Sequence, residues 1–403
     1  NTYGASESVE EYVTRGQLFD YDSQRAQYEA QALFRYTSTS GIVNWMLNNA
    51  WPLIYWNQFD FYMNPHGSTF GVAKANEPVH IMYNPYDKDV YVINNTTQSY
   101  GDMTATLRLY DINGNLISEP LTKTVNIVAD GASEPVPVGT HGRDTIEQQW
   151  IGLDYDSETD TYTKRYYNIN GQVKQSSGVN KLWSYEDIQD SLTGTLTDVY
   201  FIRLELTDGD GQVVSYNSYA QAIRSDVAGA NHGWNRSKIF QNADLTQLNQ
   251  LPNVELTVKQ ISSTTEDGKV TQTLEISNPT GAIAYAVELK AYADASKAEL
   301  VAPVFYGDNL FTLFPGETRT ITITHNAKDL AGDAVISVNC YNNAIDGEKP
   351  KTITNIYGGA KTENGTYNLA KNAEVTLVSG ELAKNSDPAN ATTVSARGEA
   401  NAA

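Results

Sequence analysis

The hydrophobic pattern divides the chain into a helical first part and a long β-rich remainder. Ser8 and Glu11 form a capping box, in which each side chain can satisfy the backbone N–H of the other residue. Residues 17–36 contain neither Gly nor Pro and carry apolar residues at helical spacing, so a helix is expected there, with Gly16 as a candidate interruption. Residues 42–47 are mostly apolar and predict a short strand buried on both faces. This order indicates an α/β unit.

Strand-like runs separated by hairpin turns follow from about residue 77. Three such blocks are expected, over residues 104–117, 200–214 and 255–276, each with an Asn-Gly or Asp-Gly pair at its turn. Those pairs supply the positive φ angles that tight hairpins need. Strands at this spacing predict β-sandwiches of the immunoglobulin type, with residues 245–253 as a linker between two of them.

Composition restricts the classes of partner. A chain of 403 residues with 40% hydrophobic residues is long enough for two or three domains. Its formal charge of −20 argues against nucleic acid and against an anionic membrane surface, because both need clustered Lys and Arg. No apolar run approaches the ~20 residues of a membrane span. A neutral or cationic partner such as a polysaccharide remains compatible.

The residues that usually carry metals and nucleophiles are few and scattered. Cys340 is the one cysteine, so no intrachain disulfide can form, and its strand-like surroundings predict a buried, inert thiol. The five His residues lack the spacing of a zinc site or of a Ser-His-Asp triad, and no nucleotide-binding motif occurs. No metal and no cofactor are therefore expected.

The richest local feature is a cluster of aromatic and amide residues. Trp45, Trp51 and Trp56 lie within twelve residues of one another. We interpret Trp45 as a stacking platform for a pyranose ring, with Asn48 holding sugar hydroxyls. Asp60 and Tyr62 are further candidates for substrate contact. The alternative is that these aromatics pack beneath a barrel rim, and for any one of them except Trp45 that alternative is favoured.

Glycoside hydrolysis needs two carboxylates flanking one bond, and the sequence offers no such pair. Glu10 and Glu11 open a helix, where they favour the helix dipole. Asp60 has no evident partner. The acidic residues 154–160 imitate a calcium loop, but Thr159 replaces the required Gly, so a solvated hairpin is expected. We predict no catalytic residue in this chain.

Several motifs together resemble glycoside hydrolase family 2, in its exo-β-D-glucosaminidase and β-mannosidase-like branch. Residues 45–52, with Trp-x-x-Asn-x-x-Trp, resemble the last barrel strand and its loop. Residues 70–80, with Lys-Ala-Asn-Glu-Pro, resemble the turn into an immunoglobulin-like domain. Residues 200–219 resemble the end of that family's second such domain, and residues 303–317 resemble a domain typical of exo-glucosaminidases.

The resemblance implies a mainly β chain with four parts. They are the last helix, strand and loop of a (β/α)8 TIM barrel (1–77), an immunoglobulin-like sandwich (78–245) with an insertion at about 135–197, a second, exo-glucosaminidase-type sandwich (250–345), and the truncated start of a discoidin-like carbohydrate-binding module (356–403). On composition alone, that last part could equally be a disordered tail. Both chain ends look like cuts in a longer protein. Because one helix and one strand cannot bury their apolar faces alone, exposed Trp and Phe are expected on residues 1–75.

The resemblance further implies a secreted or periplasmic, retaining, exo-acting enzyme that removes β-linked glucosamine or mannose from an oligo- or polysaccharide. Its acid/base and nucleophile Glu residues would lie on earlier barrel strands, outside this chain, and the fragment alone would be inactive. Trp45 and Asn48, then Asp60 and Tyr62, would form one wall of its glycone pocket. The rival hypothesis is a non-enzymatic adhesion or carbohydrate-binding protein of immunoglobulin-like domains, which leaves the Trp-rich segment without a purpose.

Overall fold

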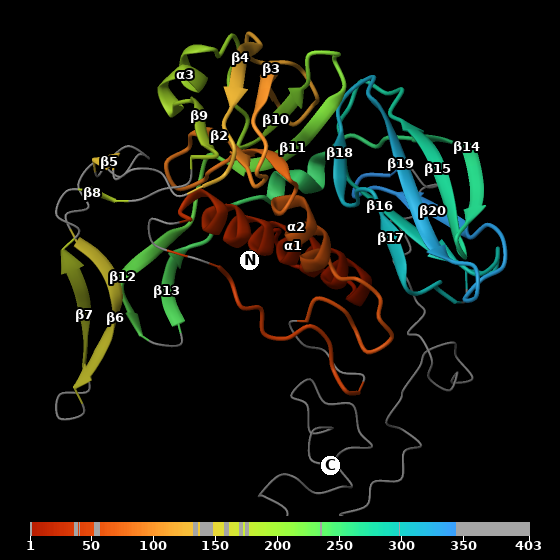
Figure 1. Cartoon of the computed structure of the whole chain (residues 1–403), viewed down its shortest axis with the longest axis horizontal. Helices are drawn as coiled ribbons and strands as arrows, with labels where there is room; N and C mark the ends of the chain where they lie inside the picture. Colours follow the sequence, from red (N-terminus) through yellow and green to blue (C-terminus); the bar gives the residue numbers. More distant parts are fainter. Residues whose placement is uncertain are drawn as a thin grey trace, which may run out of the picture.

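The structure is a computed structural model in which two β-sandwiches pack against a long helix. Figure 1 shows α1 beneath the first sandwich, with the second sandwich to one side of it. The structure describes residues 2–35, 39, 41–51, 57–131, 136–137, 148–156, 161–168, 172–173, 177–233, 236–297 and 299–343. The expected mainly β fold with immunoglobulin-like sandwiches is confirmed. The candidate module over 356–403 lies outside the described residues.

Helix α1 (Val9–Leu33) confirms the predicted helix: it begins after the expected cap Ser8 and ends three residues before Tyr36. Its N-cap Ser8 accepts the Glu11 N–H at 3.1 Å. The Glu11 carboxylate accepts from the backbone N–H of Glu7 at 2.7 Å, so it reaches one residue beyond the expected cap. Gly16 does not interrupt the helix, and the residues beside it that face the fold, Arg15 and Leu18, are buried.

Helix α2 (Gly67–Ala75) crosses α1 at a very short distance. A Cβ atom on Gly67 would lie 2.0 Å from the carbonyl oxygen of Gln17, and one on Gly71 would lie 2.3 Å from that of Tyr21. Only glycine permits such backbone contact. The two glycines, four residues apart on one helix face, therefore fix where α2 sits on α1.

The first sandwich packs a three-stranded sheet against a four-stranded sheet. The strands, in sheet order, are β1 (Val79–Tyr83), β2 (Val90–Asn94) and β9 (Val179–Trp183), then β11 (Val213–Ala222), β10 (Val199–Thr207), β3 (Tyr100–Tyr110) and β4 (Leu121–Ile127). Alternate residues of β3, from Met103 to Leu109, are buried, as expected for a strand with one face in the core. Helix α3 (Tyr185–Asp190) adds Ile188 to that core.

The second sandwich follows the same plan. Its strands, in sheet order, are β14 (Thr257–Glu266), β15 (Lys269–Ser277), β19 (Thr318–Asn326) and β17 (Val304–Tyr306), then β18 (Phe311–Leu313), β16 (Ala284–Tyr292) and β20 (Val335–Asn339). Cys340 follows β20 and is buried, and burial raises the pKa of its thiol to about 12. The prediction of a buried thiol is confirmed.

The expected linker between the sandwiches is a packed joint. Residues 246–250 form a 3-10 helix, η1 (Thr246–Gln250), and Leu248 is fully buried. It belongs to one apolar cluster with Tyr21 of α1, Phe201 of the first sandwich and Phe314 of the second. Because one core joins these elements, α1 and both sandwiches support one another.

Two sequence-based expectations differ from the structure. Residues 42–47 form no strand, because no strand in the described part of the chain lies beside them to satisfy their backbone groups. Within the span expected as an insertion (135–197), β9 pairs with β2, and Trp183 lies in the sandwich core. Small two-stranded sheets complete the described fold: β5 (Val136–Pro137) with β8 (Gln172–Val173), β6 (Gln148–Asp156) with β7 (Thr161–Asn168), and β12 (Val227–Gly233) with β13 (Arg236–Gln241).

Candidate functional site

The aromatic segment predicted to bind sugar lies on the surface. Trp45 is 73% exposed and Trp51 is 50% exposed, while Phe61 is exposed to a smaller degree. Asn48 is exposed as well. Trp56 lies outside the described residues. The expectation of exposed aromatic residues on this first part of the chain is confirmed for Trp45, Trp51 and Phe61, so Trp45 is free of the core and its ring face is accessible.

The structure brings the two halves of the predicted site together. The Phe59 N–H donates to the carbonyl of Leu47 at 2.9 Å. The Asn48 amide nitrogen lies 3.7 Å from the sulfur of Met63. Asn48 therefore stands against the 59–65 loop, which also carries Asp60 and Tyr62. Residues fifteen positions apart in sequence thus form one continuous surface.

Asp60 has a well-defined place in that loop. Its Oδ1 accepts the backbone N–H groups of Tyr62 at 2.8 Å and Asn64 at 2.9 Å, and its Oδ2 accepts the Asn64 side-chain amide at 2.8 Å. The carboxylate thereby closes its own turn. A contact between Asp60 and a sugar stays a prediction, and the structure gives the residue a structural role as well.

Tyr62 is partly buried beside this turn. Its ring makes an edge-to-face contact with Phe61, with the ring centroids 5.0 Å apart. Burial and the nearby Asp60 carboxylate raise the pKa of its phenol, so Tyr62 stays neutral and can donate a hydrogen bond at neutral pH.

The loop is anchored to α1 through the start of α2. The Gly67 N–H donates to the Gln17 side chain at 2.6 Å, and the Ser68 N–H donates to the Asp20 carboxylate at 3.0 Å. These acceptors on α1 satisfy two of the unpaired N–H groups that begin any helix. His66 continues the anchoring, since its Nδ1 lies 2.9 Å from the carbonyl of Asn57. Helix α1 thus holds the base of the candidate site.

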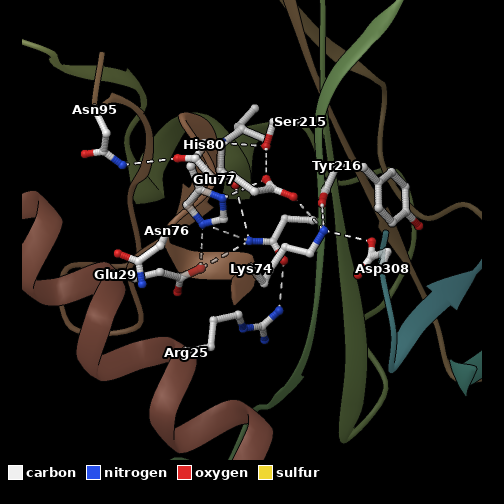
Figure 2. A network of polar contacts seen from close by, with 12 residues as sticks. Arg25, Glu29, Lys74, Asn76, Glu77, His80, Asn95, Ser215, Tyr216 and Asp308 are labelled. Carbon is white, nitrogen blue, oxygen red and sulfur yellow. Dashed lines mark hydrogen bonds and ion pairs between the residues drawn. The ribbon is translucent and has the colours of Figure 1, made fainter. Parts of the chain in front are cut away.

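A second group of polar residues is buried where α1 meets both sandwiches (Figure 2). His80 lies at its centre, with Nε2 2.9 Å from Glu29 Oε1 and Nδ1 3.1 Å from Glu77 Oε2. Glu29 also accepts from the Tyr219 hydroxyl at 2.7 Å and from the Asn217 amide at 3.1 Å. We call this group, Glu29, Glu77, His80, Asn217 and Tyr219, the His80 cluster.

The His80 cluster favours the charged imidazolium. Burial alone would lower the pKa of His80, but its hydrogen bonds to Glu29 and Glu77 outweigh burial and raise that pKa above its ordinary value. Burial likewise opposes the charge on Glu77, while His80 and Lys74 lower its pKa. With both ring nitrogens facing carboxylates, the ring satisfies both neighbours only when both nitrogens carry protons.

An ion-pair chain extends from the His80 cluster to the second sandwich. Lys74 Nζ lies 2.8 Å from Glu77 Oε1 and 2.8 Å from Asp308 Oδ2. Asp308 also pairs with Arg319 at 2.8 Å. Burial would raise the pKa of Asp308, but Lys74 and Arg319 lower it. These pairs tie α2 to the second sandwich in an environment with little water, where each partner depends on the others.

Sequence reasoning did not identify the His80 cluster. Lys74, Glu77 and His80 stand within seven residues, and the segment was noted only as a turn into a sandwich. Their charged side chains in so short a run were the available signal. Glu29 and Asn217 are far away in sequence, so only the fold reveals their contact with His80. Because His80 and Glu29 are 0% and 1% exposed, this cluster supports the structure and offers no access to a substrate.

Among the described residues, no group of three or more His, Cys, Asp or Glu side chains is arranged to hold a metal ion. None of the helices in the described ranges is both long and apolar enough to cross a bilayer.

Comparison with known proteins assigns the second sandwich. The sequence model of the exo-beta-D-glucosaminidase Ig-fold domain matches residues 234–343. This region is similar to the Ig-fold domain of exo-β-D-glucosaminidases. The resemblance to the glucosaminidase branch of glycoside hydrolase family 2 is thereby confirmed, and the predicted second sandwich, 250–345, falls almost wholly within the matched range.

The similarity extends over most of the chain. The exo-beta-D-glucosaminidase of Amycolatopsis orientalis is 30% identical over 336 residues, which are 82% of this chain and 27% of that protein. The enzyme of Hypocrea jecorina is 29% identical over 344 residues, 83% of this chain and 32% of that protein. A mannosylglycoprotein endo-beta-mannosidase of Lilium longiflorum is 21% identical over 352 residues, 80% of this chain and 33% of that protein.

A solved structure agrees with these relatives. The exo-chitosanase CsxA of Amycolatopsis orientalis superimposes with a TM-score of 0.64 and 27% identity, over 85% of this chain and 35% of that one. The chain spans between 27% and 32% of the length of the exo-glucosaminidases it matches. Its relatives are thus glycoside hydrolases that are about three times longer.

Proposed function

We propose that this chain is the accessory part of an exo-acting glycoside hydrolase that removes β-linked glucosamine units from an oligo- or polysaccharide. The observation that carries this proposal is the similarity to exo-β-D-glucosaminidases over 82% of the chain. Five such enzymes are 27–30% identical, against 21% for the mannosidase. The proposal therefore takes glucosamine as the sugar unit that the enzyme removes, with mannose as the alternative.

In this proposal the chain supports the catalysis and another part of the protein performs it. Retaining hydrolysis needs an acid/base and a nucleophile about 5–5.5 Å apart. The carboxylates buried in the described chain are those of Glu29, Asp89 and Asp111. They contact His80, Lys181 and the backbone N–H groups of the Asp111 turn, respectively. The two sandwiches and α1 would hold the Trp45 face against the sugar. A polymeric substrate, too large to enter a cell intact, suits a secreted or periplasmic enzyme.

A time course on a chitosan oligosaccharide tests the proposal. The longer protein of which this chain would be a part, here called the parent protein, should release glucosamine from the first minutes. The oligosaccharide should shorten by one sugar unit at a time. Oligomers of mixed length appearing before any monosaccharide would contradict an exo-acting enzyme. Release of mannose from a β-mannan oligosaccharide, with none of glucosamine, would replace glucosamine by the alternative. No product from either would favour the adhesion-protein hypothesis.

A further inference from the structure

Three loops in the described part of the chain share one hairpin design. They begin at Asp60, Asp111 and Asp208, and in each the Asp Oδ1 accepts the backbone N–H groups two and four residues later. Counting the Asp as the first residue of the turn, the fourth residue is Met63, Gly114 or Gly211. Its N–H donates to the Asp carbonyl in each turn, at 3.0–3.1 Å. The same contacts therefore define the same turn at three places.

The fourth residue of the turn has a positive φ angle in all three. Gly114 has φ 87° and Gly211 has φ 78°, as such a turn requires. The equivalent residue of the first loop is Met63, with φ 66°. A side chain other than glycine is strained in this region. In these three turns glycine stands at this position twice and methionine once. A long side chain takes the same place in the turn at Asp294, where the Lys297 N–H donates to the Asp294 carbonyl at 3.2 Å and Lys297 has φ 54°.

Of the three turns, the one that carries Met63 meets the predicted sugar site. Met63 is 39% exposed, and its sulfur lies 3.7 Å from the amide nitrogen of Asn48. A thioether sulfur is a weak acceptor and a polarizable contact surface. The turn itself gains nothing from the Met side chain, since its backbone contacts match those of the glycine loops.

We propose that Met63 is a positioning residue for the glycone site: it accepts backbone strain in order to hold the Asn48 amide in place for a sugar hydroxyl. This rests on the proposed function, because it places Asn48 in the sugar-binding wall. The strain is retained for the contact, so stability and sugar recognition should respond to Met63 in opposite directions.

The experiment compares Met63→Gly with Gly211→Met in the parent protein. Gly211 occupies the equivalent turn position with no atom within 4 Å of an added Cβ, so its replacement measures the strain of a Met in this turn away from Asn48. Thermal unfolding and the kinetics of aryl β-glucosaminide hydrolysis are measured for both variants and for the unaltered protein.

We expect Met63→Gly to raise Tm by about 2–4 °C and to lower kcat/KM by about five- to tenfold through KM, the loss expected for one misplaced hydrogen bond. Gly211→Met should lower Tm by a similar amount with unchanged kinetics. Unchanged kcat/KM in Met63→Gly, or a fall in its Tm, would overturn the proposal. If the unaltered parent protein does not hydrolyse the glucosaminide, the proposed function fails first, and the sugar-site role of Met63 fails with it.

Discussion

The imidazole of His80 lies 2.9 Å from the carboxylate of Glu29, and both side chains are completely buried. Glu29 belongs to α1 and His80 to β1, so this contact joins the long helix to the first sandwich. Loss of one buried charge leaves the other without compensation, which strongly destabilises a fold. The protonation of His80 should therefore control how firmly α1 is held.

The first prediction concerns pH. The folded state raises the pKa of His80, so its contribution to stability is complete below the unfolded value of about 6.5 and is lost as pH rises through the folded pKa. The folded state lowers the pKa of Glu77, so its contribution is complete above about 4.5 and is lost as pH falls through the folded pKa. The free energy of unfolding contributed by this pair should be greatest between about pH 4.5 and 6.5.

Urea unfolding of this chain from pH 4 to pH 9, followed by tryptophan fluorescence, measures the effect. His80→Gln serves as the comparison, because glutamine can still donate a hydrogen bond but does not titrate. The fall in stability above pH 6.5 should be smaller in His80→Gln than in the unaltered chain. Parallel profiles for the two proteins would show that His80 does not carry the dependence.

The second prediction concerns the close contact of the two helices. Gly71→Ala should destabilise the fold by about 1–3 kcal/mol, because the new Cβ would lie 2.3 Å from the backbone oxygen of Tyr21. Gly16→Ala is the matched control, since Gly16 lies inside α1 with nothing within 4 Å of its Cβ position. That change should stabilise by about 0.5–1 kcal/mol. Equal effects of the two substitutions, measured by urea unfolding, would contradict the packing described here.

The third prediction concerns Trp45. Trp45→Ala should change the unfolding free energy by no more than about 0.5 kcal/mol, because this side chain is 73% exposed. In the parent protein it should lower kcat/KM for a glucosaminide by about two- to tenfold, the range expected for one aromatic contact. Part of that loss should fall on kcat if stacking strengthens as the sugar flattens in the transition state. Normal kinetics in this variant would remove Trp45 from the sugar site.

The sequence predicted the elements that depend on local pattern. The alternation of β3, the capping Ser8 and the turn glycines Gly114 and Gly211 are all legible in a short window. The strand expected over residues 42–47 was wrong because an apolar run becomes a strand only beside other strands. The pattern of apolar and polar residues indicates the propensity of a segment, but it does not indicate which strands will lie beside that segment in the fold.

In the candidate site, too, only the features that a short stretch of sequence reveals were predicted. Trp45 and Asn48 stood out because aromatic and amide residues were concentrated there. The His80 cluster was not predicted from the sequence, because Glu29 and Asn217 are 188 residues apart and come into contact only in the fold. The role of Met63 was not predicted, because no neighbouring residue in the sequence indicates a left-handed backbone at a methionine. Its significance follows only from comparison with the two glycine loops.

In the proposed function this chain supports the hydrolysis of a β-glucosaminide without catalysing it. The most direct measurement is turnover of an aryl β-D-glucosaminide by the parent protein and by this chain alone, at equal concentrations. We predict steady hydrolysis by the parent protein and none above the blank by this chain, because acid and nucleophile must act together. Turnover that stays with this chain through purification would contradict the account, and so would an intact parent protein with no activity.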